Sequence, residues 1–440
     1  MAIEDDVLVI GGGLAGVTAA LSAAERDVRV RLLTYKQSTL RHASGLIDVL
    51  GYTPDGEGPL VDPFDALSDL PTGHPYERVG PDAVREALLY FDAVVGDAYE
   101  GRHTDANALV PTSGGTVKPT ARYPASVAAG LASDPRDALL VGFETLPDVD
   151  APLSAAHLRA VGVPFEVRGV TLSFPGVGRD DAKVTRYAHL LDRDEPVDTG
   201  VGDAPARAAL AEAVRPHLED EPRVGFPPIL GDAHHDAVRT DLEERLGVDV
   251  FEMPSGPPSL PGMRLEEVLY DALEDAGVRV TTGVPVVDYE ADAGGDRIDH
   301  VLVDRKGREV PYRATSYVLA TGGLVGKGIE STREAVSEPI FGCQVAHPPD
   351  RYDWFEDDAF ADHPFARFGV AVDRKLRPLA VDDEPEFTNL RAAGAVLGGY
   401  DFAAEKSGSG VSLSTGYVAG RLAGDAATDS NELETTEVNS

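Results

Sequence analysis

The chain has one cysteine, no long apolar run and few basic residues, and each shortage excludes something. Cys343 stands alone among 440 residues, which rules out an internal disulfide and any iron–sulfur cluster ligated by this chain alone. No apolar stretch reaches about 18 residues, so we expect no membrane-spanning helix. The first residues are acidic and enter a strand at once, which is not the pattern of a signal peptide.

Acidic side chains greatly outnumber basic ones, 75 against 39, for a formal net charge of −36. Such a surface repels itself unless salt screens it, so the simplest interpretation is a protein that works in molar salt, as in a halophile's cytoplasm. An acidic face for one basic partner is the alternative, although the acids are spread along the whole chain. The charge argues against nucleic acid as a ligand.

Buried strands alternate with helices in two parts of the sequence. Residues 6–34 read as strand, glycine turn, helix and strand, and "VLVI" is apolar throughout, as in a parallel strand covered on both faces. From about residue 139 the alternation resumes, which predicts a second α/β unit inserted into the first. We expect an N-terminal part of the core at 1–80, an inserted α/β region at 81–255, a C-terminal part of the core at 256–424 and an acidic flexible tail at 425–440.

A glycine motif stands between the first strand and the first helix. Gly11, Gly13 and Gly16 form G-x-G-x-x-G, in which the glycines permit a tight turn, a close phosphate and close packing of helix on strand. The helix N-terminus adds unpaired amides and a positive dipole end. The motif predicts a nucleotide phosphate site, and the alternative is a tight turn that binds nothing.

Two further glycine motifs follow near the other end of the chain. "YVLATGG" at 317–323 and "NLRAAGAVLGG" at 389–399 are typical of two-dinucleotide-binding-domain flavoproteins. The later "SGSGVS" puts Gly408 and Gly410 at the start of a helix, whose N-terminus could stabilise negative charge on a reduced flavin. The alternatives are ordinary glycine turns before packing segments.

The whole chain resembles the B subunit of the anaerobic glycerol-3-phosphate dehydrogenase, of a halophilic archaeal type. The matching stretches, which span residues 8 to 423, are "GGGLAG", "QSTLRHASGLIDVL", "HPY", "PSLPGMRL", "VLATGG", "SEPIFG", "RFGVAVDRKLRP" and "AAGAVLGGYDFAAEKSGSGVS". Between about 85 and 250 only the α/β pattern matches. The resemblance implies an α/β fold with a Rossmann-like two-dinucleotide-binding-domain flavoprotein core formed by both chain ends, and an inserted α/β region.

The resemblance also implies an activity and partners. It points to a flavoprotein member of a complex that oxidises glycerol 3-phosphate to dihydroxyacetone phosphate and passes electrons to quinone. The expected partners are the A subunit, a catalytic flavoprotein, and the C subunit, an iron–sulfur membrane anchor, which would hold this chain at the cytoplasmic side of the membrane. A non-catalytic relay or scaffold subunit, and an independent flavin oxidoreductase acting on another small anionic substrate, are the alternatives.

The implied cofactor for this subunit is FMN, with FAD as the alternative. A dinucleotide fingerprint predicts an Asp or Glu at the end of the second strand, to hold the adenosine ribose. Leu33, Thr34 and Tyr35 stand there instead. Because FMN needs a phosphate loop but no grip on adenosine, Thr34 favours FMN.

The candidate site residues follow from these motifs and from the resemblance. His42, a possible proton carrier, and Arg264, whose guanidinium suits a phosphate, are candidate substrate contacts, although both have ordinary structural explanations. The adjacent His234 and His235 lack a third ligand at metal spacing, so we expect no metal, and the sequence assigns no catalytic residue. The candidate cofactor-binding residues are Gly11, Gly13, Leu14, Ala15, Gly16, Thr34, Ser44, Gly45, Thr321, Gly322, Gly394, Gly408, Gly410 and Val411.

Overall fold

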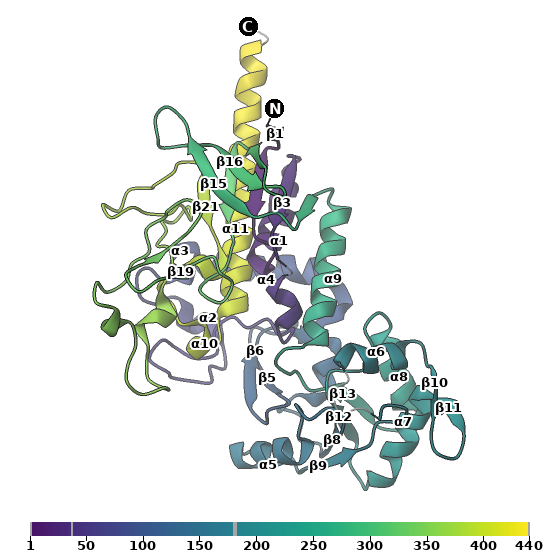
Figure 1. Ribbon diagram of the computed structural model, residues 1–440. Coiled ribbons are helices and arrows are strands. Elements are labelled where there is room, and N and C mark those ends of the chain that lie inside the picture. The colour runs from purple at the N-terminus through teal and green to yellow at the C-terminus, as the bar shows by residue number, and fades with distance from the viewer. Residues whose placement is uncertain (1, 37, 179–182, 439–440) are drawn as a thin grey trace. The chain divides into compact units, whose positions relative to one another are not determined.

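The computed structural model describes residues 2–36, 38–178 and 183–438, which fold as two compact units (Figure 1). The first, which we call the core unit, comprises Met1–Thr39, Asp48–Val95 and Val268–Ser440. The second, the inserted unit, comprises Leu40–Ile47 and Gly96–Glu267. Both ends of the chain therefore belong to the core unit, as the fold prediction requires. The inserted unit also takes in a short segment from the N-terminal part of the chain.

A five-stranded parallel sheet lies at the centre of the core unit, in the order β14-β3-β2-β18-β21. Its strands are β2 (Val7–Ile10), β3 (Val30–Thr34), β14 (Arg279–Thr282), β18 (Ser316–Leu319) and β21 (Leu390–Ala392). Every residue of β2, β18 and β21 is buried, as the continuous apolar runs predict for strands covered on both faces. Strands from both chain ends thus share one sheet, which confirms the predicted Rossmann-like core.

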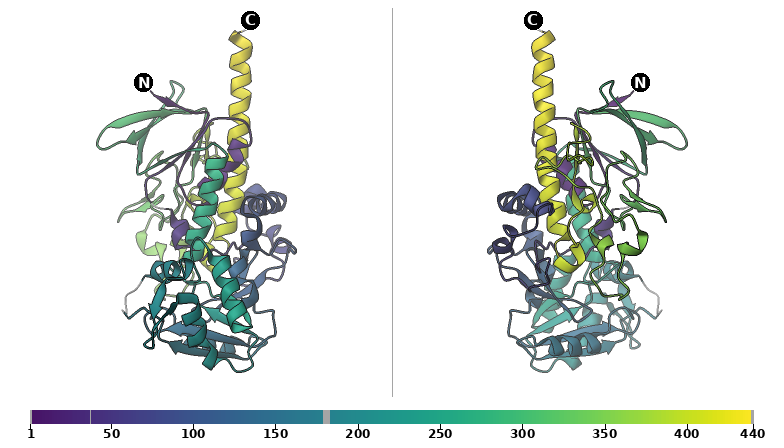
Figure 2. Two further views of the ribbon diagram at one scale, coloured as in Figure 1. Left: turned by 90° about the vertical axis from the view of Figure 1, so that its right-hand side faces the viewer. Right: turned by 90° about the vertical axis from the view of Figure 1, so that its left-hand side faces the viewer.

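Two helices rich in small residues pack side by side in this unit, α1 (Leu14–Ala24) and α11 (Gly408–Val438), as Figures 1 and 2 show. A side chain at Gly416 or Gly420 of α11 would run into the backbone of Ala15 or Ala19 of α1. Glycine at these positions therefore lets the two helix backbones approach closely.

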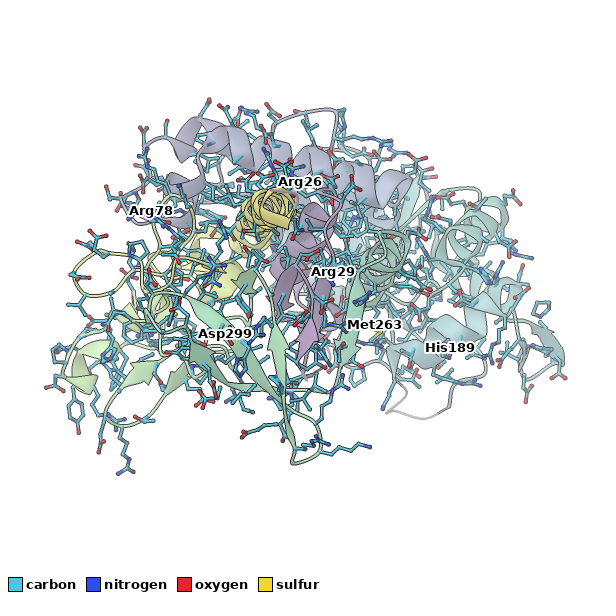
Figure 3. The ribbon with its side chains drawn as sticks, turned by 90° about the horizontal axis from the view of Figure 1, so that it is seen from above. Arg26, Arg29, Arg78, His189, Met263 and Asp299 are labelled. Atoms are coloured by element: carbon cyan, nitrogen blue, oxygen red, sulfur yellow. The ribbon has the colours of Figure 1, made fainter. Side chains whose placement is uncertain are left out.

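The structure corrects one expectation, because residues 425–438 continue α11 instead of forming a flexible tail. Ala423 and Ala427 are fully buried, and Arg26 pairs with Asp425 at 2.6 Å. Figure 3, which looks along α11, shows Arg26 beside this helix. The acidic composition of the segment suggested a flexible tail, but its small residues form a stripe that packs on the rest of the core unit.

A second sheet of the core unit has the order β1-β17-β16-β15, and its strands β15, β16 and β17 pair antiparallel. The "FGVAVDRKLRP" stretch forms only isolated bridges, at Val370 and Val372. The elements of this sheet are β1 (Ile3–Glu4), β15 (Val286–Ala291), β16 (Ile298–Asp304) and β17 (Glu309–Arg313). The other core elements include α2 (Pro63–Leu67), α3 (Pro75–Val79), α4 (Pro81–Val95), α10 (Phe402–Glu405) and the pair β19 (Glu330–Ser331) and β20 (Val336–Ser337).

The inserted unit is built on a four-stranded parallel sheet in the order β13-β12-β8-β9. Its strands, β8 (Ala138–Phe143), β9 (Val167–Leu172), β12 (Arg223–Phe226) and β13 (Asp249–Glu252), confirm the predicted second α/β alternation. Its helices are α5 (Ala151–Val161), α6 (Val184–Asp192), α7 (Ala206–Val214), α8 (His235–Leu246) and the first part of α9 (Leu260–Asp275).

Three short antiparallel pairs complete the inserted unit. The pairs are β4 (Tyr99–Glu100) with β7 (Tyr123–Pro124), β5 (Ala108–Pro111) with β6 (Val117–Thr120), and β10 (Pro196–Asp198) with β11 (Asp203–Pro205). Sequence periodicity did not predict the β5–β6 hairpin or α6. In the part of the chain that the structure describes, no helix has the length and apolarity needed to cross a membrane.

Candidate functional site

The turn between β2 and α1 has a shape that glycine alone permits. Gly11 has a φ of +118°, and a side chain there would run into the backbone of Ala320, just after β18. Gly16, in the first turn of α1, would place a side chain on the carbonyl of Gly11. The close approach of α1 to this turn therefore requires both glycines, in the roles expected of the first and third glycines of the motif.

Gly13 differs from these two, because the space beside its Cα is open. Its φ of −81° and ψ of −177° are backbone angles that any residue adopts. A Cβ built on it would have Thr39 Oγ1 as its nearest neighbour, at 3.6 Å. Gly13 is the N-cap of α1, so the amides that follow it, from Leu14 on, lie in the turn where a helix leaves its N–H groups without intrahelical acceptors. An open glycine facing such amides fits the phosphate of a nucleotide.

Thr34 ends β3, where a dinucleotide-binding fold usually has its ribose-binding acid. Its hydroxyl donates to the Lys36 carbonyl at 2.9 Å. Tyr270, from α9, donates its hydroxyl to the Gly12 carbonyl at 3.1 Å. A Cβ on Gly12 would lie within 3.0 Å of both the Tyr270 and the Thr34 hydroxyls, so these three residues pack together beside the glycine turn.

The loop after β18 brings an unpaired hydroxyl to the same region. Thr321 Oγ1 is buried and has no hydrogen-bond partner within the described residues. The next residue, Gly322, has a φ of +86°. Leaving a buried hydroxyl unpaired costs about 1–3 kcal/mol. Thr321 is thus a group that a bound ligand would satisfy.

The loop after β21 lies against the first turn of α1. Gly394 has a φ of +77°, and a Cβ built on it would lie 2.6 Å from the Cβ of Ala15. Its amide donates to Thr415 Oγ1 of α11 at 2.8 Å. The structure therefore brings Gly394 and the glycine turn together, whereas Val411 is fully buried inside the unit.

Protein atoms already occupy the N-terminus of α11. The Asp48 carboxylate accepts the Ser409 amide at 3.2 Å, and the Asp48 amide donates to Ser409 Oγ at 2.8 Å. A side chain on Gly410 would run into the Tyr76 hydroxyl and the Asp48 carbonyl, while one on Gly408 would press on Phe402. Packing and capping thus account for Gly408 and Gly410 without a ligand.

The segment Leu40–Ile47 places three predicted site residues, His42, Ser44 and Gly45, in the inserted unit. Gly45 has a φ of +78°, and its carbonyl accepts the Tyr99 hydroxyl at 2.7 Å. Ser44 Oγ accepts the Leu46 amide at 3.4 Å, while His42 is exposed. These residues therefore belong to a different unit from the glycine turn.

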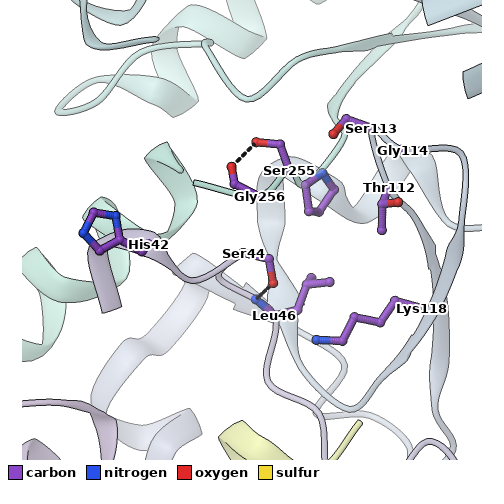
Figure 4. Close-up of a pocket in the computed structure, with 10 residues that line it drawn as sticks. His42, Ser44, Leu46, Thr112, Ser113, Gly114, Lys118, Ser255 and Gly256 are labelled. Atoms are coloured by element: carbon purple, nitrogen blue, oxygen red, sulfur yellow. Dashed lines mark hydrogen bonds between the residues drawn. The ribbon is translucent and has the colours of Figure 1, made fainter. Parts of the chain in front are cut away.

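A pocket of about 350 Å³ lies within the inserted unit (Figure 4). Lys118 extends into it from β6 toward Leu46. Of the described residues that line it, four carry hydroxyl groups and none is acidic. This volume lies near the lower end of the range for small-molecule sites. The lining residues are His42, Ser44, Leu46, Thr112, Ser113, Gly114, Lys118, Pro254, Ser255 and Gly256.

Arg264 does not line this pocket but forms a buried ion pair with Glu252. Arg264 Nη1 lies 2.6 Å from Glu252 Oε2, and Nη2 lies 3.1 Å from Oε1. Arg264 Nε also donates to the Gly231 carbonyl at 3.1 Å, and the Leu230 amide donates to Glu252 Oε1 at 2.9 Å. Burial raises the pKa of Glu252, but attraction to Arg264 and the hydrogen bonds that the carboxylate accepts together leave the pKa lowered. This network ties α9 to β13 and the loop after β12.

Two residues at these sites, Lys118 and Tyr270, were not predicted from the sequence. Lys118 lies in a hairpin whose "TSGG" turn is a hairpin signal, and that signal could have placed it opposite the strand before. Tyr270 lies 258 positions from Gly12 in an amphipathic helix, so no local pattern distinguishes it from a packing residue.

Comparison with known proteins gives a family model and curated relatives. The FAD-binding domain family matches residues 6–411. A probable B subunit of the anaerobic glycerol-3-phosphate dehydrogenase from Halobacterium salinarum is 62% identical over 429 residues, which cover 98% of this chain and all of the relative. The B subunit of the anaerobic glycerol-3-phosphate dehydrogenase from Pectobacterium atrosepticum is 31% identical over 93% of this chain and 96% of its own length.

Among solved structures, the open conformation of a flavocytochrome c3 fumarate reductase aligns with 97% of this chain and 78% of its own. The identity is 12% and the TM-score is 0.41. The family match and the two curated relatives agree with the parallel core sheet and its glycine turn. The chain therefore belongs to the FAD-binding domain family and, within it, to the family of anaerobic glycerol-3-phosphate dehydrogenase B subunits.

Proposed function

We propose that the chain is the flavin-bearing B subunit of a membrane-associated glycerol-3-phosphate dehydrogenase. The complex would oxidise sn-glycerol 3-phosphate to dihydroxyacetone phosphate and pass the two electrons to quinone. The observation that carries this proposal is the 62% identity to a relative of that name over nearly the whole chain, on a fold whose glycine turn is intact.

In this proposal the residues of the core unit bind and orient the flavin. The amides that follow Gly13 would meet its phosphate, and the Thr321 hydroxyl would gain the partner that it lacks among the described residues. Bound there, the flavin would supply the electron transfer, for which no side chain is suited. Ser44 and Gly45 belong to the inserted unit and remain proposed contacts of the flavin.

We propose FMN as the flavin, with FAD as the alternative. The absence of a carboxylate at Thr34 favours FMN, because no acid is present to hold an adenosine ribose. The family that matches this chain is described as an FAD-binding domain, which favours FAD. Acid extraction followed by chromatography distinguishes the two, and stoichiometric FAD would overturn the choice of FMN.

The proposed partners are a larger catalytic flavoprotein and an iron–sulfur protein that anchors the complex to the membrane. The support is the single cysteine, Cys343, which is buried. Burial raises the pKa of its thiol and leaves it a poor metal ligand. Electrons that leave the flavin by iron–sulfur clusters must therefore pass to another chain.

Substitution at Gly13 tests the flavin site without disturbing the fold. A Gly13→Ala methyl group fits the existing backbone angles and meets Thr39 only at ordinary contact distance, but it occupies the open face of the turn. We expect flavin content, measured by visible absorption after reconstitution, to fall at least tenfold, while the flavin-free variant and the flavin-free wild type melt at the same temperature. Gly178→Ala, at an exposed glycine with open space around it, is the matched control.

Two results would contradict this proposal. A wild-type chain that stays colourless after reconstitution with either flavin is not a flavin-bearing protein. Full flavin content in Gly13→Ala would show that the glycine turn does not bind the flavin phosphate. Turnover of glycerol 3-phosphate only in the presence of the companion chains is expected, whereas turnover by this chain alone would favour an independent oxidoreductase.

A further inference from the structure

We propose that the pocket of the inserted unit binds the phosphate group of a small phosphorylated ligand, with Lys118 as its principal charged contact. The inference depends on the proposed function only for the choice of glycerol 3-phosphate as a probe. All the described residues that line the pocket belong to the inserted unit.

The charge of the lining separates this pocket from the rest of the chain. Acidic residues make up 75 of 440 positions, yet none of the described lining residues is acidic. Lys118 is one of only seven lysines in the sequence, and His42 adds an imidazole to the lining. In so acidic a protein, an acid-free pocket with a lysine fits a negatively charged ligand.

The hydrogen-bonding groups of the lining also suit a phosphate. Ser44, Thr112, Ser113 and Ser255 contribute hydroxyls from three separate segments. Ser44 Oγ accepts the Leu46 amide, which leaves its own hydrogen available to donate. Several hydroxyls beside one ammonium group match a ligand with several acceptor oxygens on one centre.

The segments that carry these groups are fixed to one another. The Ser113 amide donates to the Pro254 carbonyl at 2.9 Å, which joins the β5–β6 turn to the loop after β13. Across the turn, the Thr112 and Thr116 hydroxyls lie 2.8 Å apart. Arg41, next to His42, pairs with Glu266 of α9 at 3.0 Å. The lining is therefore preorganised within the unit, which lowers the cost of binding.

The position of the pocket in the fold supports the same conclusion. Pro254, Ser255 and Gly256 lie just beyond the carboxyl end of β13, a strand of the parallel sheet, and only Met253 stands between. In open parallel α/β sheets, ligands bind outside the carboxyl ends of the strands. The pocket thus lies at the edge of the sheet where such folds place their ligands.

Phosphorus NMR of glycerol 3-phosphate tests the inference on the full flavin-loaded chain in molar potassium chloride. We expect saturable line broadening with the wild type, and at least a tenfold loss of affinity in Lys118→Met, because a charge-assisted contact is lost. Lys118→Arg should retain most of the binding. Lys183→Met removes an exposed lysine of the same unit that does not line the pocket, and should bind as the wild type.

Inorganic phosphate and glycerol, added as competitors, separate the two halves of the ligand. Displacement by phosphate and not by glycerol is expected. No saturable binding by the wild type, equal binding by Lys118→Met, or equal losses in Lys118→Met and Lys183→Met would each overturn the inference. Flavin absorption measured on the same samples keeps the two proposals apart, because a yellow protein that binds no phosphate leaves the proposed function standing.

Discussion

The buried pair of Glu252 and Arg264 gives the sharpest stability prediction. Both side chains are at least nine-tenths buried, and they share two hydrogen bonds of 2.6 and 3.1 Å. Glu252→Gln keeps the shape and the acceptor for the Leu230 amide but removes the negative charge. The variant therefore leaves the buried Arg264 charge without the carboxylate that hydrogen-bonds to it, and only the attraction of Asp192 and Asp232 remains.

Removing one partner of a buried ion pair costs about 3–5 kcal/mol, much more than the pair itself contributes over an apolar replacement. For a unit of this size, each kcal/mol shifts the melting temperature by about 2–4 °C, so the inserted unit should melt roughly 6–20 °C lower. Replacing both partners, as in Glu252→Gln with Arg264→Met, should recover part of that loss.

The pH dependence of this effect has a definite sign. Burial raises the pKa of Glu252 in the folded state, but attraction to Arg264 and the hydrogen bonds to the carboxylate together leave that pKa lowered. Its contribution is therefore complete above the unfolded-state pKa of a glutamate and is lost as the pH falls through the lower folded-state pKa. The difference between wild type and Glu252→Gln should shrink in acid.

Calorimetry in molar potassium chloride measures these shifts. The control is Asp241→Asn, which breaks the partly exposed i,i+4 pair with Arg245 on α8 and should cost less than about 1 kcal/mol. A Glu252→Gln loss no larger than that of the control would refute the assignment of a buried charge pair. So would a difference between wild type and Glu252→Gln that grows as the pH falls.

Four further outcomes follow from the core and inserted units. Ala427→Asp, at a fully buried position of α11, should cost more than about 2 kcal/mol by thermal melting, whereas a flexible tail would tolerate it. Tyr270→Phe should weaken flavin binding about threefold to tenfold in a fluorescence titration, because the Gly12 carbonyl loses its donor. Cys343 should resist thiol reagents until the chain unfolds, because burial raises its pKa. The Arg136 hydrogen bond lowers the pKa of Asp134 to about 2, so Asp134→Asn should remove stability at neutral pH, with the difference from wild type vanishing toward that value.

Sequence reasoning worked where the signal was local and periodic. Strands such as β2 and β8 are continuous apolar runs, and the antiparallel strands around residues 286–313 carry their own turn residues. It failed for α11 beyond Gly424, because acidic residues on the exposed face masked the buried alanines. Residues 368–378 also carry apolar residues, but these form isolated bridges and not a ladder. In both segments the secondary structure depends on tertiary packing, which composition does not reveal.

The glycine motifs show a second limit of the sequence. The sequence alone does not distinguish the glycines of these motifs, which are Gly11, Gly13, Gly16 and Gly410, because each fits a ligand-binding motif. The structure separates them by what a Cβ would meet: backbone or side-chain atoms at Gly11, Gly16 and Gly410, but open space at Gly13. Where a Cβ would clash with protein atoms, packing alone explains the glycine. Where the space beside the Cα is open at a helix N-terminus, a phosphate can approach the backbone amides closely. Of these four glycines, Gly13 alone has open space of this kind.

The acidity of the chain bears directly on how it could bind phosphate at all. A net charge of −36 opposes any anion at long range, but in molar salt the screening length falls to about 3 Å, so the distant acids contribute little. What remains is the local lining, which at the described pocket is acid-free and holds Lys118. In molar salt a strongly acidic protein can therefore still bind an anion, provided that the site itself excludes carboxylates. Phosphate affinity should accordingly fall, not rise, when salt is lowered within the range in which the chain stays folded.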